Sequence, residues 1–151
     1  MGDFLTKPIT EKNATDGKND RLMYGACSMQ GWRKSNEDAH IHDLDLGDGN
    51  SLFTVFDGHG GKLVSKYLKD NITKYIFKKT DINIYQQKST ITSKFFGKLF
   101  DKLQNDLIAS HPIAVKRCGS TALCGVQYID KMNRNMLWLA NVGDSRAVIY
   151  N

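Results

Sequence analysis

The chain has 151 residues, of which 40% are hydrophobic and 25% are charged, and its formal net charge is +5 at pH 7. These values are ordinary for a globular protein, and the length allows one domain at most, or part of one. No apolar run is long enough to cross a membrane, and the lysines stand singly along the expected helices without a nucleic-acid-binding motif. We therefore expect no membrane-spanning segment and no nucleic-acid partner.

The cysteines are three in number and include no CxxC pair: Cys27, Cys118 and Cys124. An odd number of scattered cysteines favours free thiols in a reducing compartment, and a zinc site would need more ligands at closer spacing. The N-terminus has no apolar signal segment. These features predict a cytoplasmic or nuclear protein.

Residues 1–21 are polar and predict a flexible, extended N-terminal arm. Gly2 followed by Thr6 fits the N-myristoylation pattern, in which the glycine carries the acyl chain. One acyl chain gives weak, reversible membrane contact, so peripheral membrane association is expected if the glycine is acylated. Short motifs of this kind also occur by chance, and an unmodified arm is the alternative.

Residues 24–29 alternate weakly and predict a strand, which residues 31–32 interrupt. Arg33 follows, and its planar guanidinium suits a phosphate held by two parallel hydrogen bonds. Glu37 and Asp38 come next, and adjacent carboxylates on a strand point to opposite faces, so only one can aim directly at a given site. Taken alone, such charges are more often ordinary surface residues.

Residues 43–50 resemble a calcium loop only superficially. Gly47 and Asp48 reverse the order that an EF-hand requires, and no glutamate closes the loop. We expect a hairpin turn instead, leading into a strand at residues 52–56. Because that strand is almost continuously apolar, it is predicted to be buried on both faces.

The most specific stretch of the sequence is Asp57-Gly58-His59-Gly60-Gly61. A carboxylate at the end of a buried strand is costly unless it is paired. A hard divalent cation would pair with Asp57, and Gly58 could add its carbonyl oxygen as a second ligand. The alternative is a strand that simply ends in an Asp-Gly turn.

The remaining elements predict an α+β fold with an antiparallel sheet core and helices packed on one face. Helices are expected at 63–79 and 91–108, with a loop at 80–88, because apolar residues recur there at helical spacing. Strands are expected at 120–129, 136–142 and 146–150, joined by turns at 130–135 and 143–145. Asp144 stands in the last of these turns, where it either caps the turn or binds a metal.

Four motifs together resemble the metal-dependent serine/threonine protein phosphatases, the PPM family or type 2C. In chain order they are Arg33…Glu37-Asp38, Asp57-Gly58-His59-Gly60-Gly61, Gly119-Ser120-Thr121-Ala122 and Gly143-Asp144-Ser145-Arg146. The opening Met1-Gly2, Phe4-Leu5 and Lys7-Pro8, and the stretch from Tyr24-Gly25 to Ser28-Met29-Gln30-Gly31-Trp32-Arg33, look like the animal-type members. The resemblance implies an antiparallel β-sandwich flanked by helices. It also implies hydrolysis of phosphoserine and phosphothreonine esters in phosphorylated protein substrates, with two Mn²⁺ or Mg²⁺ ions and a third, weaker one.

The resemblance also implies a role for each matching residue. Asp57 would bridge both metals, and Gly58 would give a carbonyl ligand. Glu37 would serve one metal partly through water, with Asp38 as its supporting neighbour. Asp144 would belong to the third metal site. Arg33 would bind the substrate phosphate, and His59 would be the general acid, whereas Ser120 and Thr121 would form a structural sheet motif.

Chemistry supports that reading, since two divalent ions can activate a water and clamp phosphoryl oxygens without a cysteine nucleophile. In this family two further metal-binding aspartates lie beyond the region that these 151 residues match. We therefore expect residues 22–151 to be the N-terminal portion of a catalytic domain with little or no activity alone. The alternative is an inactive phosphoprotein-binding or membrane-recruited regulatory module.

Overall fold

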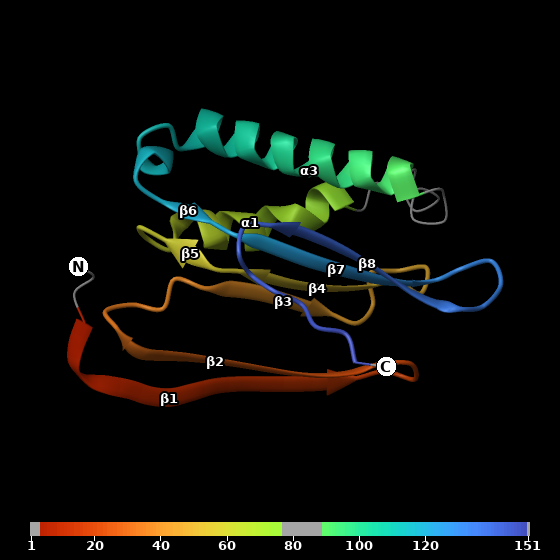
Figure 1. Cartoon of the computed structure of the whole chain (residues 1–151), viewed down its shortest axis with the longest axis horizontal. Coiled ribbons are helices and arrows are strands. Elements are labelled where there is room, and N and C mark those ends of the chain that lie inside the picture. The colour runs from red at the N-terminus through yellow and green to blue at the C-terminus, as the bar shows by residue number, and fades with distance from the viewer. Residues whose placement is uncertain (1–3, 77–88, 151) are drawn as a thin grey trace. The chain divides into compact units, whose positions relative to one another are not determined.

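The computed structural model describes residues 4–76 and 89–150, and in the second range the side chains only from residue 93 onward (Figure 1). The chain divides into two compact units, Met1–Glu37 and Asp38–Asn151. Each unit is described by itself below. None of the described helices is both long and apolar enough to cross a bilayer.

The first unit is an antiparallel hairpin of β1 (Phe4–Lys18) and β2 (Met23–Arg33). Its turn is closed by Asn19, whose Oδ1 accepts hydrogen bonds from the amides of Arg21 and Leu22 at 2.9 and 2.8 Å. The flexible arm expected over residues 1–21 is therefore wrong for the described residues, which are extended but paired. Backbone hydrogen bonds pair this polar strand with β2, so its sequence contains no apolar pattern from which a strand could be predicted.

The strand at residues 24–29 is confirmed, but it does not stop at residues 31–32. Gly31 takes a positive φ of 67°, and the pairing with β1 shifts register near it, so the strand continues to Arg33. A glycine that accepts this backbone angle allows an irregularity within a strand rather than ending it. Gly2 lies outside the described residues, and its acylation stays a prediction.

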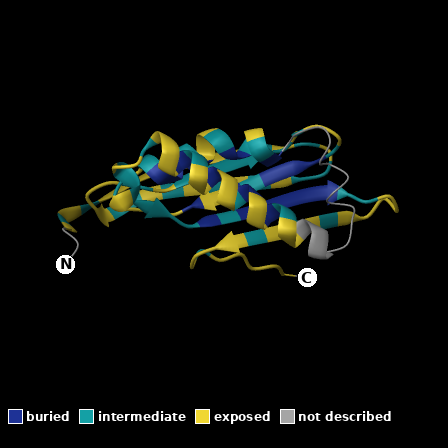
Figure 2. Ribbon diagram, turned by 90° about the horizontal axis from the view of Figure 1, so that it is seen from above, coloured by how far each residue is buried: buried dark blue, intermediate teal, exposed yellow. Residues whose placement is uncertain are grey.

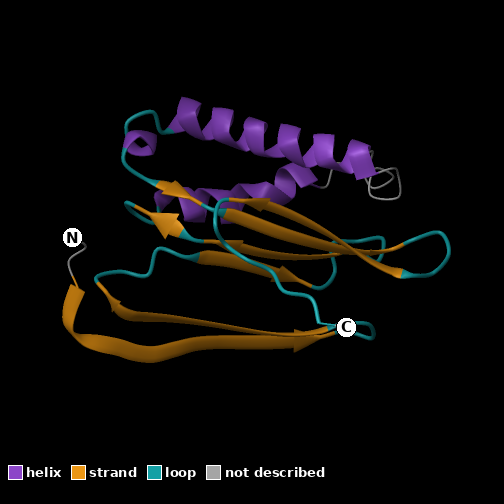
Figure 3. Cartoon of the chain, in the orientation of Figure 1, coloured by secondary structure: helices purple, strands orange, loops and turns teal. Residues whose placement is uncertain are grey.

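The second unit is built on a four-stranded sheet of order β3-β4-β7-β8, antiparallel throughout. The strands are β3 (Ala39–Asp43), β4 (Ser51–Phe56), β7 (Ala122–Ile129) and β8 (Asn135–Val142). Short turns join β3 to β4 and β7 to β8, as Figure 3 shows. The predicted hairpin turn before the central strand is confirmed, and so is the antiparallel pairing of β7 with β8, the first two strands of the predicted meander.

Two helices cover one face of this sheet: α1 (Leu63–Ile76) and α3 (Ser89–Ser110), followed by the short η1 (Ala114–Lys116). Both predicted helices are confirmed over their described parts, and the loop predicted at 80–88 lies outside the described residues. The core lies between the helices and the sheet, where Figure 2 shows buried segments of the strands. Its largest fully buried apolar side chains are Leu52, Phe56, Ile72, Ile76, Leu103 and Val126.

Only one face of β4 is fully buried, which corrects the prediction of burial on both faces. Leu52 and Phe56 point to the helices and have no exposed surface, whereas Val55 on the opposite face is 45% exposed. Because alternate residues of a strand face opposite sides, an apolar run does not by itself show that both sides are covered.

The strand predicted at residues 146–150 is also wrong. The chain after β8 bends at Gly143 and Asp144 and then follows an irregular path, with Val148 92% and Tyr150 99% exposed. A strand forms only when another strand completes its hydrogen bonds, and residues 146–150 pair with no described strand. The antiparallel sheets and two helices nevertheless confirm the α+β class.

Candidate metal and phosphate site

Asp57 occupies the junction between β4 and the two-residue strand β5 (Gly58–His59). Its backbone forms two reciprocal hydrogen bonds with Thr121: the Asp57 amide donates to Thr121 Oγ1 at 3.0 Å, and the Thr121 amide donates to the Asp57 carbonyl at 2.9 Å. Asp57 itself is exposed and Gly58 is buried. The backbone of the acidic residue is thus fixed where a dissolved ion can reach it.

Thr121 also holds the loop that carries Asp144. Its Oγ1 shares a hydrogen bond of 2.6 Å with Oγ of Ser145. Gly143 has a φ of 101°, and a Cβ there would lie 2.8 Å from Thr121 Cγ2, so this turn requires glycine. One threonine therefore connects the end of β4 to the turn after β8, which lies at the same end of the sheet.

His59 is exposed and is held beside the strand β6 (Gly119–Ser120), which pairs with β5. A Cβ placed on Gly119 would lie 2.6 Å from the His59 Nε2 atom, so the imidazole rests where Gly119 lacks a side chain. Gly60 follows with a φ of 70°, and a Cβ there would collide with the carbonyl oxygen of Arg117. The glycines of this stretch allow a close backbone approach and orient the histidine.

Arg33 and Glu37 belong to the first unit. Gln30 Nε2 donates to the Arg33 carbonyl at 2.8 Å, and Ser35 Oγ donates to Glu37 Oε1 at 3.2 Å, so the segment after β2 is internally bonded. Arg33 is exposed and Glu37 is half-buried. Within the second unit the structure brings together Asp57, Gly58, His59 and the Asp144 turn, and the pairing of that set with Arg33 and Glu37 stays a prediction.

Asp38 is the first residue of the second unit and is exposed. Its charge acts on His40, two residues further along. Burial lowers the pKa of His40, the neighbouring His42 and Lys69 lower it further, and Asp38 opposes them. Asp38 therefore contributes negative charge at the start of β3.

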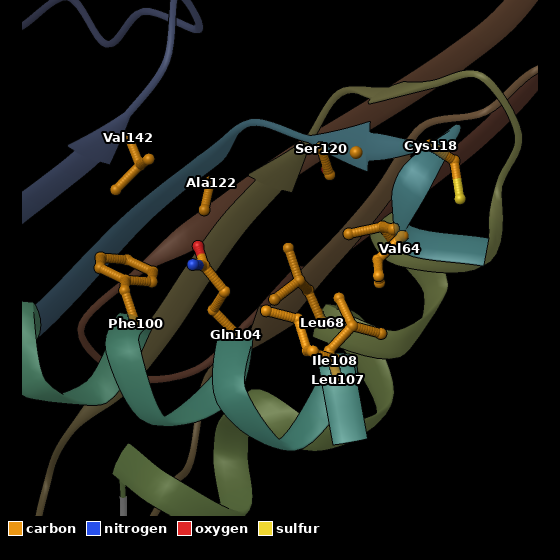
Figure 4. A pocket seen from close by; sticks show the side chains of 12 residues that line it. Val64, Leu68, Phe100, Gln104, Leu107, Ile108, Cys118, Ser120, Ala122 and Val142 are labelled. Carbon is orange, nitrogen blue, oxygen red and sulfur yellow. The ribbon is translucent and has the colours of Figure 1, made fainter. Parts of the chain in front are cut away.

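A pocket of about 330 Å³ lies between α1, α3 and the β6–β8 region. Figure 4 shows its lining side chains from close by. Val64, Leu68 and Phe100 contribute to a mainly apolar lining, which includes no carboxylate. Gly119 and Ser120 of β6 form part of its wall. Its lining does not suit a divalent cation, which prefers oxygen ligands.

The donors near Asp57 fit a hard cation in kind, because they are carboxylate and carbonyl oxygens without sulfur. In number they are few: the described residues contain no group of three or more acidic, histidine or cysteine side chains arranged to hold a metal. The assignment of Asp57 and Gly58 as metal ligands therefore stays a prediction. The role of Thr121 as the shared hydrogen-bond centre was missed, since its partners lie 64 and 24 residues away in sequence.

Comparison with known proteins shows the family of the chain. The family described as "Protein phosphatase 2C" matches residues 22–151. "Probable protein phosphatase 2C 4" of Paramecium tetraurelia is 33% identical over 99% of this chain and 50% of its own length. "Protein phosphatase 2C homolog 3" of Schizosaccharomyces pombe is 34% identical over 99% of this chain and 35% of its own length. The chain thus spans about half or less of these relatives.

Solved structures show the same fold. The serine-threonine phosphatase 2C from Toxoplasma gondii superposes with a TM-score of 0.53 at 16% identity, covering 93% of this chain and 53% of its own. A bacterial serine phosphatase carrying an R161K mutation gives a TM-score of 0.51 at 17% identity, with 91% and 49% covered. The family model matches residues 22–151, and both relatives are above 30% identical over 99% of this chain. The chain therefore belongs to the protein phosphatase 2C family.

Proposed function

We propose that the chain is the N-terminal part of the catalytic domain of a Mn²⁺- or Mg²⁺-dependent protein phosphatase that hydrolyses phosphoserine and phosphothreonine. The observation that carries this proposal is the pair of hydrogen bonds between the Asp57 backbone and Thr121, which fixes the backbone of an exposed aspartate at the end of β4. A ligand residue whose backbone is already fixed has less freedom to lose when it binds a divalent ion.

Each residue of the proposed site has a role that follows from its chemistry. Asp57 and Gly58 would hold the ions, with Glu37 and Asp38 supporting them and Asp144 serving a weaker site. Bound divalent ions of this kind supply positive charge for the phosphoryl oxygens and make water a better nucleophile.

Arg33 would orient the substrate phosphate through two parallel hydrogen bonds. His59 would give a proton to the departing serine or threonine oxygen. The ring of His59 is placed by Gly119, which leaves room for it beside β6. Substrates would be phosphorylated proteins, and membrane contact through Gly2 would depend on acylation.

The test is Mn²⁺ binding to the 151-residue chain, measured by electron paramagnetic resonance of the free ion. Asp57→Asn should reduce the affinity for Mn²⁺ by at least about tenfold, since loss of a ligand should cost no less than loss of a supporting residue. Asp101→Asn, an exposed aspartate on α3, is the matched control and should bind as the unchanged chain does. Equal Mn²⁺ affinity in both variants would contradict the proposed site.

A second assay addresses the reaction. The 151 residues replace the corresponding half of the Paramecium tetraurelia relative, and phosphate release from a phosphothreonine peptide is measured with and without chelator. We expect Mn²⁺-dependent release that Asp57→Asn abolishes. Release that persists in chelator would refute the metal requirement, whatever the binding result.

A further inference from the structure

Four exposed cations lie on two elements beside the turn at Gly60 and Gly61. Lys62 directly precedes α1, and Lys66 follows it by one helical turn, with its amide bonded to the Lys62 carbonyl at 3.1 Å. Lys116 ends η1, and Arg117 comes next in the chain. All four residues are exposed, and we call them the basic patch.

The folded chain brings these two pairs of cations together. A Cβ on Gly60 would collide with the carbonyl oxygen of Arg117, so the backbone just before Lys62 touches the backbone just after Lys116. Val64 of α1 and Cys118 line the same pocket, and Figure 4 shows both at one end of it. These two contacts join the start of α1 to the end of η1, and the four cations therefore share one region of the surface.

No negative charge within these two segments offsets the basic patch. Residues 58–69 and 111–119 contain neither aspartate nor glutamate. In the described part of the chain, the ion pairs Lys102–Asp106 and Arg134–Asp130 involve other cations, and none of the four patch residues forms one. A single lysine on a helix is usually just solvated, but four cations without an ion-pair partner on two converging elements attract an anion.

The basic patch adjoins the candidate site. His59 is exposed, pairs with Gly119 and directly precedes Gly60. Asp57 and Gly60 are three residues apart, so their Cα atoms lie no more than about 11 Å from each other. An extended peptide covers the same length with about three residues. A phosphorylated residue bound at Asp57 would thus hold its neighbours about three positions away within reach of the long cationic side chains.

We propose that the basic patch binds aspartate and glutamate side chains about three positions from the phosphorylated residue of the substrate protein. This inference rests on the proposed function, because a phosphate held at the Asp57 site is what places the peptide. Charge complementarity identifies the partner as an acidic segment. The position beside Asp57 and His59 favours a substrate over an anionic membrane surface.

The experiment compares two phosphothreonine peptides in the chimera with the Paramecium tetraurelia relative. One peptide has glutamates at the second to fourth positions on both sides of the phosphothreonine, and the other has glutamines there. We expect a higher kcat/KM for the glutamate peptide. Lys62→Gln combined with Arg117→Gln should lower the ratio of the two kcat/KM values at least about twofold, since each exposed ion pair is worth up to about a fivefold change. About 0.5 M sodium chloride should lower the same ratio in the unchanged chimera.

Lys94→Gln combined with Lys98→Gln is the matched control and should keep the ratio. Both lysines are exposed on α3, which runs antiparallel to α1 because Tyr67 lies against His111 and Tyr75 bonds to Asp106. Lys98 is therefore about 20 Å along the helix from the end of α3 that lies near the basic patch. Lys66→Gln combined with Lys116→Gln tests the other half of the patch if the first double variant fails to fold.

Peptide binding to the 151-residue chain separates this proposal from the proposed function. If the chimera releases phosphate from neither peptide, the proposed function fails, and fluorescence anisotropy of the labelled peptides decides on the basic patch. The glutamate peptide should bind more tightly than the glutamine peptide, and the patch variant should lose this preference. The proposal is overturned if the folded patch variant keeps the full preference for glutamate. Patch-dependent binding to phosphatidylserine vesicles without a peptide preference would equally overturn it, in favour of a membrane partner.

Discussion

Replacing Thr121 by valine removes one hydroxyl from the centre of the candidate site and retains a branched side chain of similar shape. The hydroxyl accepts from the Asp57 amide at 3.0 Å and shares a 2.6 Å hydrogen bond with Ser145. A typical hydrogen bond contributes about 0.5–1.5 kcal/mol net, and water can partly replace the exposed one, so the free energy of unfolding should fall by about 1–2 kcal/mol. The Asp57 and Asp144 segments should loosen together.

Urea unfolding followed by tryptophan fluorescence measures this change. Trp138 lies on β8, and its Nε1 donates to the Tyr128 hydroxyl at 3.0 Å, so it reports on the second unit. The other tryptophan, Trp32, lies in the hairpin and is replaced by phenylalanine in every variant. Mn²⁺ affinity is measured on the same samples, and Thr121→Val should weaken it because Asp57 is held less firmly.

Two comparisons separate the hydroxyl from other effects. Thr121→Ser keeps the hydroxyl and should retain Mn²⁺ affinity, although it loses the methyl group that contacts Gly143. Ser145→Ala should destabilise the unchanged chain more than it destabilises Thr121→Val, with a coupling energy of at least about 0.5 kcal/mol. If the two substitutions are additive, or if Thr121→Val unfolds at the same urea concentration as the unchanged chain, the hydroxyl does not organise the site.

Two further predictions concern the backbone and the helices. Gly60→Ala should lower the free energy of unfolding by about 2–3 kcal/mol, because φ is positive there and the new Cβ would collide with the Arg117 carbonyl. Gly47→Ala is the control: φ is also positive but the Cβ would enter open space, so the loss should be about 1 kcal/mol. Similar urea midpoints for the two variants would rule out the collision. The 2.6 Å hydrogen bond between Tyr75 and Asp106 raises the pKa of Tyr75 from 10.0 to about 12 and lowers the pKa of Asp106. The stabilisation linked to Tyr75 is therefore complete below pH 10 and is lost as the pH rises through 12. The stabilisation linked to Asp106 is complete above the usual pKa of an aspartate and is lost as the pH falls below that value. Tyr75→Phe should flatten both limbs of the stability curve, and unchanged limbs would contradict the link.

Features that depend on neighbouring residues could be predicted from the sequence. The apolar run 52–56, its abrupt end at Asp57 and the glycines that follow define a strand and a sharp turn without reference to the rest of the chain. Helical periodicity likewise locates α1 and α3, because the spacing of apolar residues records which side of a helix is buried.

Features that depend on distant partners could not be predicted in the same way. The pairing of β1 with β2 rests on backbone hydrogen bonds, which a polar sequence without apolar alternation does not predict. Residues 146–150 have strand-forming side chains, but no described strand lies beside them. A prediction of a strand from propensity alone was therefore wrong. The Thr121 hydroxyl joins segments far apart in sequence, and only the folded sheet brings them together.

Among the described strands β8 lies at the end of its sheet, which has a practical consequence for handling this 151-residue chain. The sequence of this strand, NMLWLANV, contains no charge and no proline, and its Leu137 and Leu139 side chains are 47% and 42% exposed. Natural sheets protect such borders with lysine or proline to prevent chains from adding onto one another. We expect turbidity that rises with concentration, and light scattering should show that Leu139→Lys suppresses it while the helical circular dichroism is unchanged.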